Sequence, residues 1–356
     1  MSTPKSAAAA AVEPVPYREV WRGKIVRFAA LLIVLLAVTI LAATMGSAAI
    51  GLPDILAMLL GRLDDARAGA KIHILWNIRL PRVIFGLVGG FGLAIAGTVM
   101  QAVLRNALAS SYTLGVSSAA GFGAALAIGL GLGIWGGKFL IIGNAFIFGL
   151  LSMALVYGIA TLKGARAGTL ILAGIAISYL FSALIALVKY LVQHDVLAGI
   201  VFWLLGGLHL ATWENVILLL PIVILPSLWL ILKFPWDLNA LSAGDEVATS
   251  LGVHPERTRI LVLILAALIT SGIVAFAGVI GFVCLVGPHM ARLIIGSDHR
   301  YLLPFAGLTG AILLLGADTV GRTIIQPTEL PVGIVTALLG VPFFLHLLLR
   351  SRGYWE

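Results

Sequence analysis

Long apolar stretches separated by short polar breaks run along almost the whole chain. A helix needs roughly 20 residues to cross about 30 Å of hydrocarbon, and ten of the stretches are long or apolar enough to do so. The predicted spans lie near residues 28–50, 82–104, 114–135, 139–162, 168–191, 216–234, 258–277, 279–296, 302–320 and 331–349. The pattern therefore predicts an all-α polytopic membrane protein with ten transmembrane helices.

The segments outside these spans are short. Residues 200–210 are apolar but too few for an eleventh span, so a re-entrant or surface helix is predicted there. The first apolar run exceeds the apolar part of a usual signal peptide and no convincing cleavage site follows, so it is interpreted as a span. We therefore predict a disordered N-terminal tail at residues 1–27, which contain an alanine run. The membrane domain is predicted at residues 28–350 and a second tail at residues 351–356.

Lysine and arginine residues orient the predicted bundle. An even number of spans places both termini on the same side, and basic residues are enriched in cytoplasmic segments. With cytoplasmic termini, most of the 23 Lys and Arg residues fall in cytoplasmic segments. We therefore expect both termini in the cytoplasm.

Composition supports a membrane protein. The chain is 61% hydrophobic and 11% charged, whereas a soluble domain has about a quarter of its residues charged. The net charge of +8 would suggest a nucleic-acid partner in a soluble protein, but the basic residues lie mostly at span ends. Membrane lipid, and no nucleic acid, is the expected partner. The single cysteine, Cys284, excludes an intrachain disulfide and a cysteine-rich metal site.

Glycine is abundant, with 41 residues. Within the spans it recurs as the pairs Gly86/Gly90 and Gly129/Gly133, a spacing that lets helix backbones approach closely. Tight packing is one interpretation. The alternative, a wide and weakly interacting pathway, suits the small and hydroxyl-bearing residues 113–125.

No catalytic or cofactor-binding signature is found in the sequence. The nearest approach to a phosphate-binding P-loop is Gly137-Lys138, where Leu132 replaces the first glycine and Phe139 replaces Ser or Thr. The 7 histidines form no HExxH motif and no i,i+4 pair, which disfavours metal ligation. The sequence favours a conduit or a receptor over an enzyme, with no cofactor or metal bound by the chain.

Several long segments, taken together, resemble the FecCD-type permease family, the membrane subunits of type II ABC importers for ferric siderophores, haem and cobalamin. The segments are 78–118, 241–253 (LSAGDEVATSLGV), 277–304 and 330–350, and the resemblance runs from about residue 28 to 350. The chain departs from the family at Ala107 and Ser111, where proline is common; proline would have fixed φ in the turn after Asn106.

The resemblance implies a ten-helix, cobalamin-permease-like subunit in the inner membrane that dimerises around a central path. It also implies two separate ATPase subunits, which use ATP and Mg, and a substrate-binding protein that docks outside. The cargo would be a metal chelate, an iron-siderophore first and haem or cobalamin as alternatives.

Three outer-face arginines match the family's docking positions for carboxylates of the binding protein. Arg79 and Arg82 precede the second span, and Arg322 follows the ninth. The fork of an arginine suits a carboxylate, although arginines near span ends also commonly snorkel to the interface. Asp318 lies one helix turn before Arg322 and either pre-orients it or satisfies it completely.

On the cytoplasmic side, the resemblance places an ATPase-coupling helix in residues 241–253. Asp245 and Glu246 suit the N-terminus of a short helix, so a capped connector is the alternative. The coupling residues implied by the family are Ser242, Gly244, Asp245, Glu246, Leu251 and Gly252.

The resemblance also places two cytoplasmic constrictions of the path. The first lies at Asn106 and Leu108, after the inner end of the second span. The second lies in the loop 163–168 between the fourth and fifth spans, with Ala167 and Gly168 at the matching positions. The small residues 109–123 would line the path or pack against it. Walls that bind weakly suit passage of a bulky chelate.

Two other classes of function stay open on the sequence alone. An ion-coupled secondary transporter would require a buried acidic residue in mid-span, and the lone candidate, Asp318, falls at a span end. A receptor or a structural membrane protein would leave the 241–253 motif unexplained.

Overall fold

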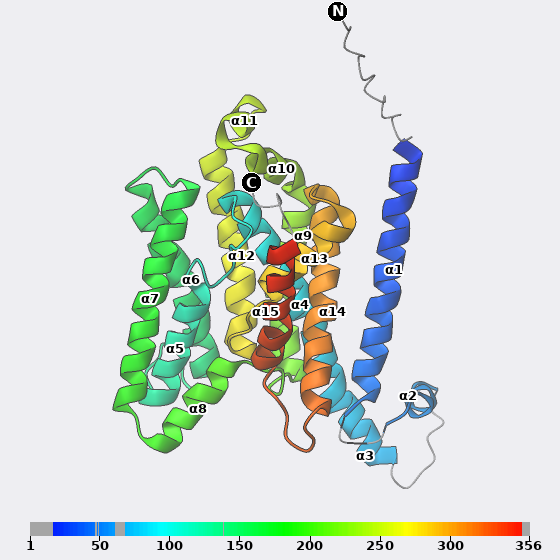
Figure 1. Ribbon diagram of the computed structural model, residues 1–356. Coiled ribbons are helices and arrows are strands. Elements are labelled where there is room, and N and C mark those ends of the chain that lie inside the picture. Colours follow the sequence, from blue (N-terminus) through cyan, green and yellow to red (C-terminus); the bar gives the residue numbers. More distant parts are fainter. Residues whose placement is uncertain (1–16, 47, 49, 61–67, 138, 351–356) are drawn as a thin grey trace, which may run out of the picture.

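The computed structural model describes residues 17–46, 48, 50–60, 68–137 and 139–350, and within these residues the regular elements are all helices (Figure 1). Seven helices are long and apolar enough to cross a membrane. The helices of these seven segments are α1 (Tyr17–Thr44), α4 (Leu80–Leu104), α6 (Phe139–Thr161), α7 (Ala167–Leu191), α9 (Trp213–Lys233), α12 (Pro255–Ala277) and α14 (His299–Thr323). The predicted all-α membrane bundle is confirmed.

The other three predicted spans are shorter helices, α5 (Val116–Leu130), α13 (Val283–Ile295) and α15 (Val332–Arg350). The predicted bounds 114–135 and 279–296 were too wide. Helix α5 lies between two left-handed glycines, Gly115 with φ +75° and Gly131 with φ +65°, a backbone conformation that ends helices. Residues 278–282 are not helical and form the loop between α12 and α13.

Six short helices complete the described chain: α2 (Leu52–Leu59), α3 (Ala68–His73), the π-helix η1 (Ile74–Arg79), α8 (His194–Leu205), α10 (Pro235–Ala243) and α11 (Asp245–Ser250). The apolar run 200–210 contributes only the end of α8 and then leaves the helix. Its depth in a membrane stays a prediction.

Helix α1 corrects the predicted N-terminal tail, because residues 17–27 are helical and continuous with the first span. The rest of that tail and residues 351–356 lie outside the described residues. We name the two ends of the bundle by the helices they hold: the α11 end carries residues 234–254, and the α2 end carries residues 52–60 and 68–79. The start of α1 and the end of α15 both point toward the α11 end (Figure 1), as an even number of spans requires.

Helix α4 runs through the centre of one half of the bundle and packs against α14, α13, α12 and α9. A Cβ atom on Gly90 would collide with the carbonyl of Gly310 on α14, and one on Gly129 would lie 2.9 Å from Val188 on α7. Gly90 and Gly129 therefore serve close helix packing, and the pathway interpretation is not needed for them. Gly133 lies beyond the end of α5, so the second predicted pair is not on one helix.

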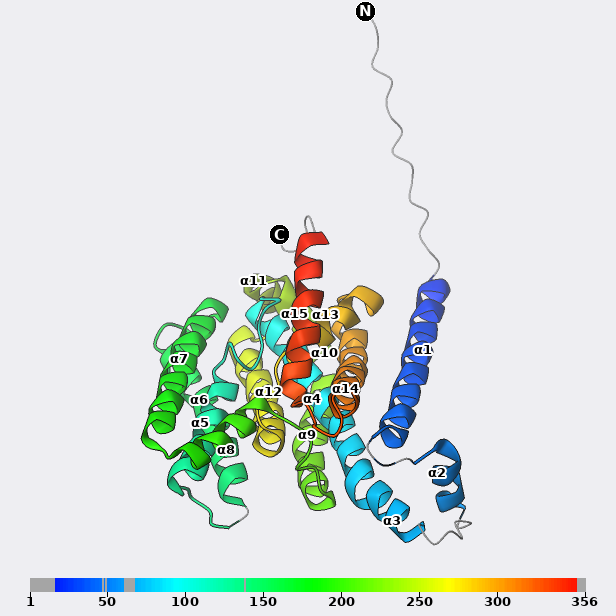
Figure 2. The ribbon, with the colours of Figure 1, turned by 60° about the horizontal axis from the view of Figure 1, so that its bottom comes forward.

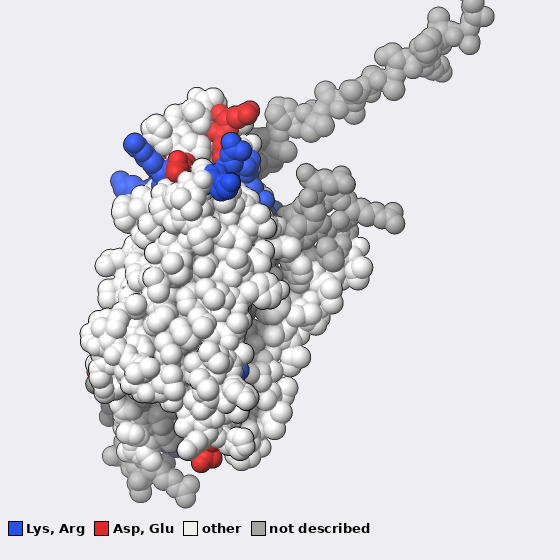
Figure 3. Space-filling model, turned by 90° about the vertical axis from the view of Figure 1, so that its left-hand side faces the viewer, with Lys and Arg blue, Asp and Glu red and all other residues white. Residues whose placement is uncertain are grey.

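Helices α5, α6 and α7 pack together as the other half, with α8 against α5 (Figures 1 and 2). The outer face of this half is almost free of charge between its two ends, and lysine and arginine side chains gather at the α11 end (Figure 3). An apolar belt of this kind matches a bilayer, and the basic end matches a cytoplasmic face.

Candidate functional site

The three arginines predicted to dock a partner lie close together at the α2 end. Arg79 ends η1, Arg82 lies in the first turn of α4, and Arg322 lies in the last turn of α14. All three are buried, with 4%, 8% and 7% of their surface exposed. Their guanidinium groups are therefore turned into the protein, and their partners decide what remains available to another chain.

Asp318, fully buried on α14, is the centre of this cluster. Arg82 donates from Nε to its Oδ1 at 2.9 Å, with Nη2 2.8 Å from the same oxygen, and Arg322 donates from Nε to Oδ2 at 3.0 Å. One carboxylate thus neutralises much of two cations. Such pairing is needed, because an unpaired buried charge costs several kcal/mol (about 3–5).

Arg79 and Arg322 also donate hydrogen bonds from their guanidinium groups to backbone carbonyls. Arg322 donates to the Met45 and Ala42 carbonyls at 3.1 Å each, and Arg79 donates to the Ala43 and Thr44 carbonyls at 2.8 and 2.7 Å and also to that of Ala48. These groups close the C-terminal end of α1, where carbonyls lack helical partners. Asp318 therefore does more than pre-orient Arg322: with the α1 carbonyls it satisfies that side chain.

Glu329, between α14 and α15, completes the cluster. Its Oε2 accepts from Nη1 of Arg82 at 2.8 Å, and 47% of its side chain is exposed. The outward side of Arg82 is thus occupied by an acid of the same chain. Docking of a partner's carboxylate on these arginines stays a prediction, and it would require that carboxylate to replace Glu329.

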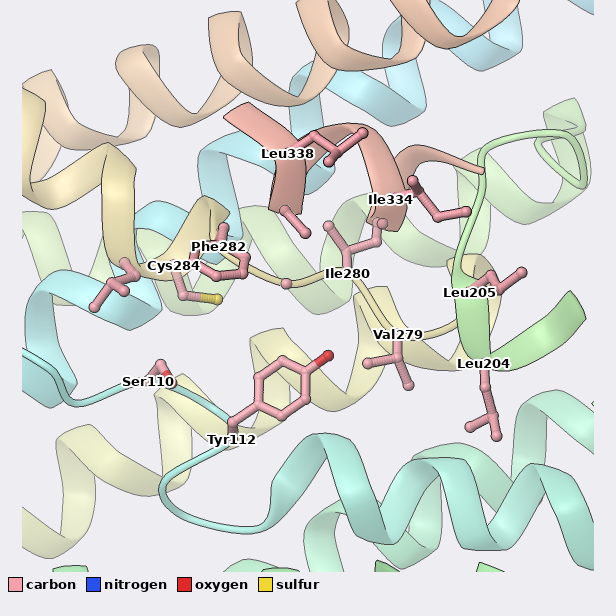
Figure 4. A pocket seen from close by; sticks show the side chains of 14 residues that line it. Ser110, Tyr112, Leu204, Leu205, Val279, Ile280, Phe282, Cys284, Ile334 and Leu338 are labelled. Carbon is pink, nitrogen blue, oxygen red and sulfur yellow. The ribbon is translucent and has the colours of Figure 1, made fainter. Parts of the chain in front are cut away.

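A cavity of about 610 Å³ opens between the two halves of the bundle (Figure 4). Its walls come from the turn after α4, the end of α8, the 279–282 loop, the start of α13 and α15. Figure 4 shows the ring of Tyr112 beside the cavity, with its hydroxyl facing Val279 and Ile280. The lining residues are Ser110, Tyr112, Leu204, Leu205, Val279, Ile280, Gly281, Phe282, Cys284, Leu285, Gly333, Ile334, Ala337 and Leu338. None of them is charged.

The small residues 109–123 mostly pack and do not line this cavity. Ser117 and Ala119 are fully buried, Ser117 donates to Oγ of Ser111 at 3.0 Å, and Ser111 lies 3.8 Å from the sulfur of Cys284. Only Ser110 and Tyr112 of this stretch reach the cavity. The sequence analysis missed the aromatic residue because its neighbours are small, although an aromatic side chain in such a run was a signal.

Asn106 and Leu108 lie in the turn that closes α4. Arg105 adopts a left-handed conformation with φ +47°, and the amide of Asn106 donates to the Gln101 carbonyl at 3.1 Å, a usual helix-ending arrangement. Oδ1 of Asn106 accepts from the amide of Leu108 at 2.8 Å. The side chain of Asn106 thus holds the turn that proline at position 107 would otherwise restrict, and Leu108 is left 48% exposed.

The two residues of the second predicted constriction differ in exposure: one is buried and the other lies at the surface. Ala167 is 8% exposed and belongs to the main hydrophobic core, whereas Gly168 is exposed with open space around its Cβ position. Neither constriction is tested by one copy of the chain, because the path is expected between two copies.

The coupling segment 241–253 is two helices and not one. They break at Gly244, where φ is +126°, so Ser242 lies in the last turn of α10, which ends at Ala243, and Asp245 begins α11. Ser242 donates to the Leu238 carbonyl at 2.7 Å. Asp245 contacts Nη2 of Arg259 at 2.7 Å.

The outward surface of this segment is partly apolar. Leu251 is 67% exposed, Gly252 follows it with φ +81°, and Glu246 is exposed. Val247, which the sequence analysis did not single out, is 42% exposed. Because Val247 and Leu251 lie four residues apart they form one apolar face, and this spacing was a signal.

In the described part of the chain, no three His, Cys, Asp or Glu side chains lie close enough to hold a metal ion.

Comparison with known proteins shows the relationships of the chain. The sequence profile of the FecCD transport family matches residues 32–350. The hemin transport system permease protein of Yersinia pestis is 42% identical over 289 residues, which are 80% of this chain and 85% of that protein. The cobalamin import system permease protein of Halobacterium salinarum is 42% identical over 283 residues, 78% of this chain and 74% of that protein. A solved structure described as an inward-facing conformation of a metal-chelate type ABC transporter is 32% identical, with a TM-score of 0.82 over 92% of this chain and 99% of that one.

Proposed function

This chain belongs to the FecCD transport family, and we propose that it is the membrane subunit of an ATP-driven importer for a metal chelate. The observation that carries the proposal is the partly apolar surface of 245–252 at the α11 end, which suits a groove in an ATPase subunit. In this proposal ATP and Mg are used by two partner ATPase subunits. A second copy of the chain completes the path, and a substrate-binding protein docks at the α2 end. The α11 end, with both termini, faces the cytoplasm across the inner membrane.

For the cargo we propose a bulky organic chelate of a metal, an iron-siderophore first, with haem or cobalamin as alternatives. The uncharged walls of the 610 Å³ cavity support this class. An inorganic oxyanion would need donors or cations to replace its water, since removing a charge from water is costly. A large chelate shields its metal with organic groups, and these can slide past leucine, isoleucine and one tyrosine.

An ion-coupled secondary transporter is disfavoured by the surroundings of Asp318. That carboxylate lies at the end of α14, bound by Arg82 and Arg322, so it is poorly suited to bind and release a coupling ion. The secondary-transport alternative would need another buried acid in mid-span.

The proposed function is tested by purifying the chain with its ATPase and binding-protein partners and placing the complex in proteoliposomes. We expect copurification of the ATPase and uptake of labelled ferric siderophore that requires ATP and is unaffected by ionophores. Uptake that needs no ATPase and stops when an ion gradient is abolished would contradict the proposal. Parallel uptake of haem and cobalamin decides among the chelates.

The coupling surface is tested at Gly252. We expect Gly252→Trp to detach the ATPase or to abolish ATP-driven uptake, because the ring would stand beside Leu251 where the partner's groove must close. Nothing lies within 4 Å of the Cβ position, so the ring itself should not disturb the subunit. The left-handed backbone does oppose any side chain there, at about 1–2 kcal/mol.

Gly252→Ala is the matched control, since it has the same backbone strain without the ring. We expect the alanine variant to keep ATPase binding and most uptake. Normal uptake by the tryptophan variant would make residues 241–253 a connector only.

The docking proposal is tested at Glu329 more cleanly than by reversing the charges of the buried arginines, which would also break the Asp318 pairs. We expect Glu329→Gln to strengthen binding of the binding protein about two- to fivefold, the effect of one partly exposed ion pair, because it removes the negative charge that competes for Nη1 of Arg82. Binding is measured by surface plasmon resonance at low salt.

Asp54→Asn is the control for this experiment, because Asp54 pairs with Lys71 at the same end at 2.9 Å. It removes an equal charge but leaves the pair between Glu329 and Arg82 intact. Unchanged or weaker binding by Glu329→Gln would rule out competition between Glu329 and a partner's carboxylate.

A further inference from the structure

Arg259, in the second turn of α12, is a buried cation at the α11 end, with 2% of its surface exposed. It is not one of the residues implied by the family resemblance. Its guanidinium group contacts three segments that lie far apart in the sequence. These contacts place one side chain between the coupling segment and both proposed constrictions.

The first contact is with the coupling segment. Nη2 of Arg259 donates to Oδ1 of Asp245 at 2.7 Å. Arg105 approaches the same oxygen at 3.8 Å. Asp245 is the first residue of α11, which packs against α10 and α12. A charge-assisted bond of this length is strong, so displacement of α11 would pull directly on the guanidinium group.

The other two contacts are with the segments that lead into the constrictions. Nε donates to the Val103 carbonyl at 3.1 Å, in the last turn of α4 before Asn106. Nη1 donates to the Ala165 carbonyl at 3.3 Å, in the turn before Ala167. The Val103 carbonyl lies at the end of a helix and lacks a helical partner there, whereas the Ala165 carbonyl lies in a turn between two helices. One arginine donates to both.

The two carbonyl groups lie beside turns with unusual backbones. Arg105 has φ +47° and Ala165 has φ +44°, both in the left-handed region that residues other than glycine rarely adopt. Such conformations persist where the surroundings determine them, and they gather at sites that move or bind. The planar fork of arginine can hold both turns at once, whereas the single ammonium group of lysine has no such geometry.

We propose that Arg259 is the positioning residue that transmits displacement of α11 to both cytoplasmic constrictions together. The proposal rests on the proposed function, because it needs an ATPase to move α11. Displacement of α11 shifts the Asp245 carboxylate, the guanidinium group follows, and the Val103 and Ala165 carbonyls move with it. Asn106 and Leu108 on one side and Ala167 and Gly168 on the other then change position in concert.

The test uses the whole complex in proteoliposomes and measures the coupling ratio, which is ferric siderophore taken up per ATP hydrolysed. We expect Arg259→Gln to keep ATP hydrolysis while the coupling ratio falls about fivefold or more, the lower range of allosteric coupling factors. Asp245→Asn, at a carboxylate whose side chain is 36% exposed, should lower the ratio in the same direction. The double variant should be no worse than Arg259→Gln alone, because residues that act as one unit are not additive.

Arg257→Gln is the matched control, an exposed arginine on the same helix, and should leave the ratio unchanged. A second readout is the distance between spin labels at exposed Thr249 on α11 and exposed Lys163 in the turn before α7. In the wild type the turn should follow α11, so we expect ATP to leave the distance between the labels nearly constant. In Arg259→Gln the turn should no longer follow α11, so we expect ATP to change this distance.

The possible outcomes separate a mechanical role from a merely structural one. If Arg259→Gln lowers the amount of assembled complex but leaves the coupling ratio per complex and the label movement unchanged, the proposal is wrong. If that variant does not fold, Arg259→Lys and Asp245→Asn decide, and normal ratios in both would overturn the proposal. A wild-type chain that binds no ATPase would instead contradict the proposed function, and the transmission proposal with it.

Discussion

Replacing Asp318 with alanine should severely destabilise this protein. The carboxylate is fully buried between two arginines that are themselves buried. Its removal leaves both guanidinium groups without their central anion, and breaking a buried ion pair in this way costs about 3–5 kcal/mol. We expect little folded protein after extraction into detergent, or a large drop in melting temperature measured by thermal-shift fluorescence.

Two variants show whether the loss comes from the buried charge. Asp54→Ala breaks the more exposed pair with Lys71 at the same end and should change the melting temperature little, because exposed pairs contribute little. Asp318→Asn keeps the shape and some hydrogen bonds, so it should fall between alanine and the wild type. A melting temperature for Asp318→Ala equal to that of the wild type would show that the other partners suffice, which are Glu329 for Arg82 and the α1 carbonyls for Arg322.

Replacing Asn106 with tryptophan should stop transport while the complex still assembles and binds its partners. Asn106 lies in the turn after α4, next to Leu108, where the family resemblance places the narrowest part of the path. In a symmetric dimer two copies would face each other, so each ring is met by a second one. The measurement is uptake of labelled chelate into proteoliposomes, normalised to assembled complex.

The structure supplies the control for this prediction. Oδ1 of Asn106 accepts from the Leu108 amide at 2.8 Å, so the tryptophan variant loses a turn-stabilising bond as well as gaining bulk. Asn106→Ala loses the same bond without adding bulk, at about 1 kcal/mol, and should retain most uptake. If the alanine variant were equally inactive, turn geometry and not obstruction would explain the result, and normal uptake by Asn106→Trp would remove the residue from the constriction.

The outer arginines show how far a motif alone can predict a site. The i,i+4 spacing of Asp318 and Arg322 was sufficient to predict their pairing, because one helix turn brings such residues together. Nothing local predicts that Arg82, 236 residues away, shares the same carboxylate, or that Arg79 closes the end of α1. Arg259 is a similar case, since its two carbonyl partners lie 156 and 94 residues away.

The class of protein, the ten apolar segments, the common side of both termini and the family could all be predicted before any contact was known. Hydrocarbon thickness and the cost of unpaired backbone groups act on each segment separately, so composition and length suffice for the class, the spans and the side of the termini. The family was predicted from the resemblance of long motifs such as residues 241–253. Contacts between distant segments were needed to place the starts of α5 and α13, to separate the small residues that pack from those that meet the cavity, and to assign each arginine its carboxylate or carbonyl. These features depend on close approaches between helices, such as that of Gly90 and Gly310. The residue pattern of one segment does not specify which other segment packs against it.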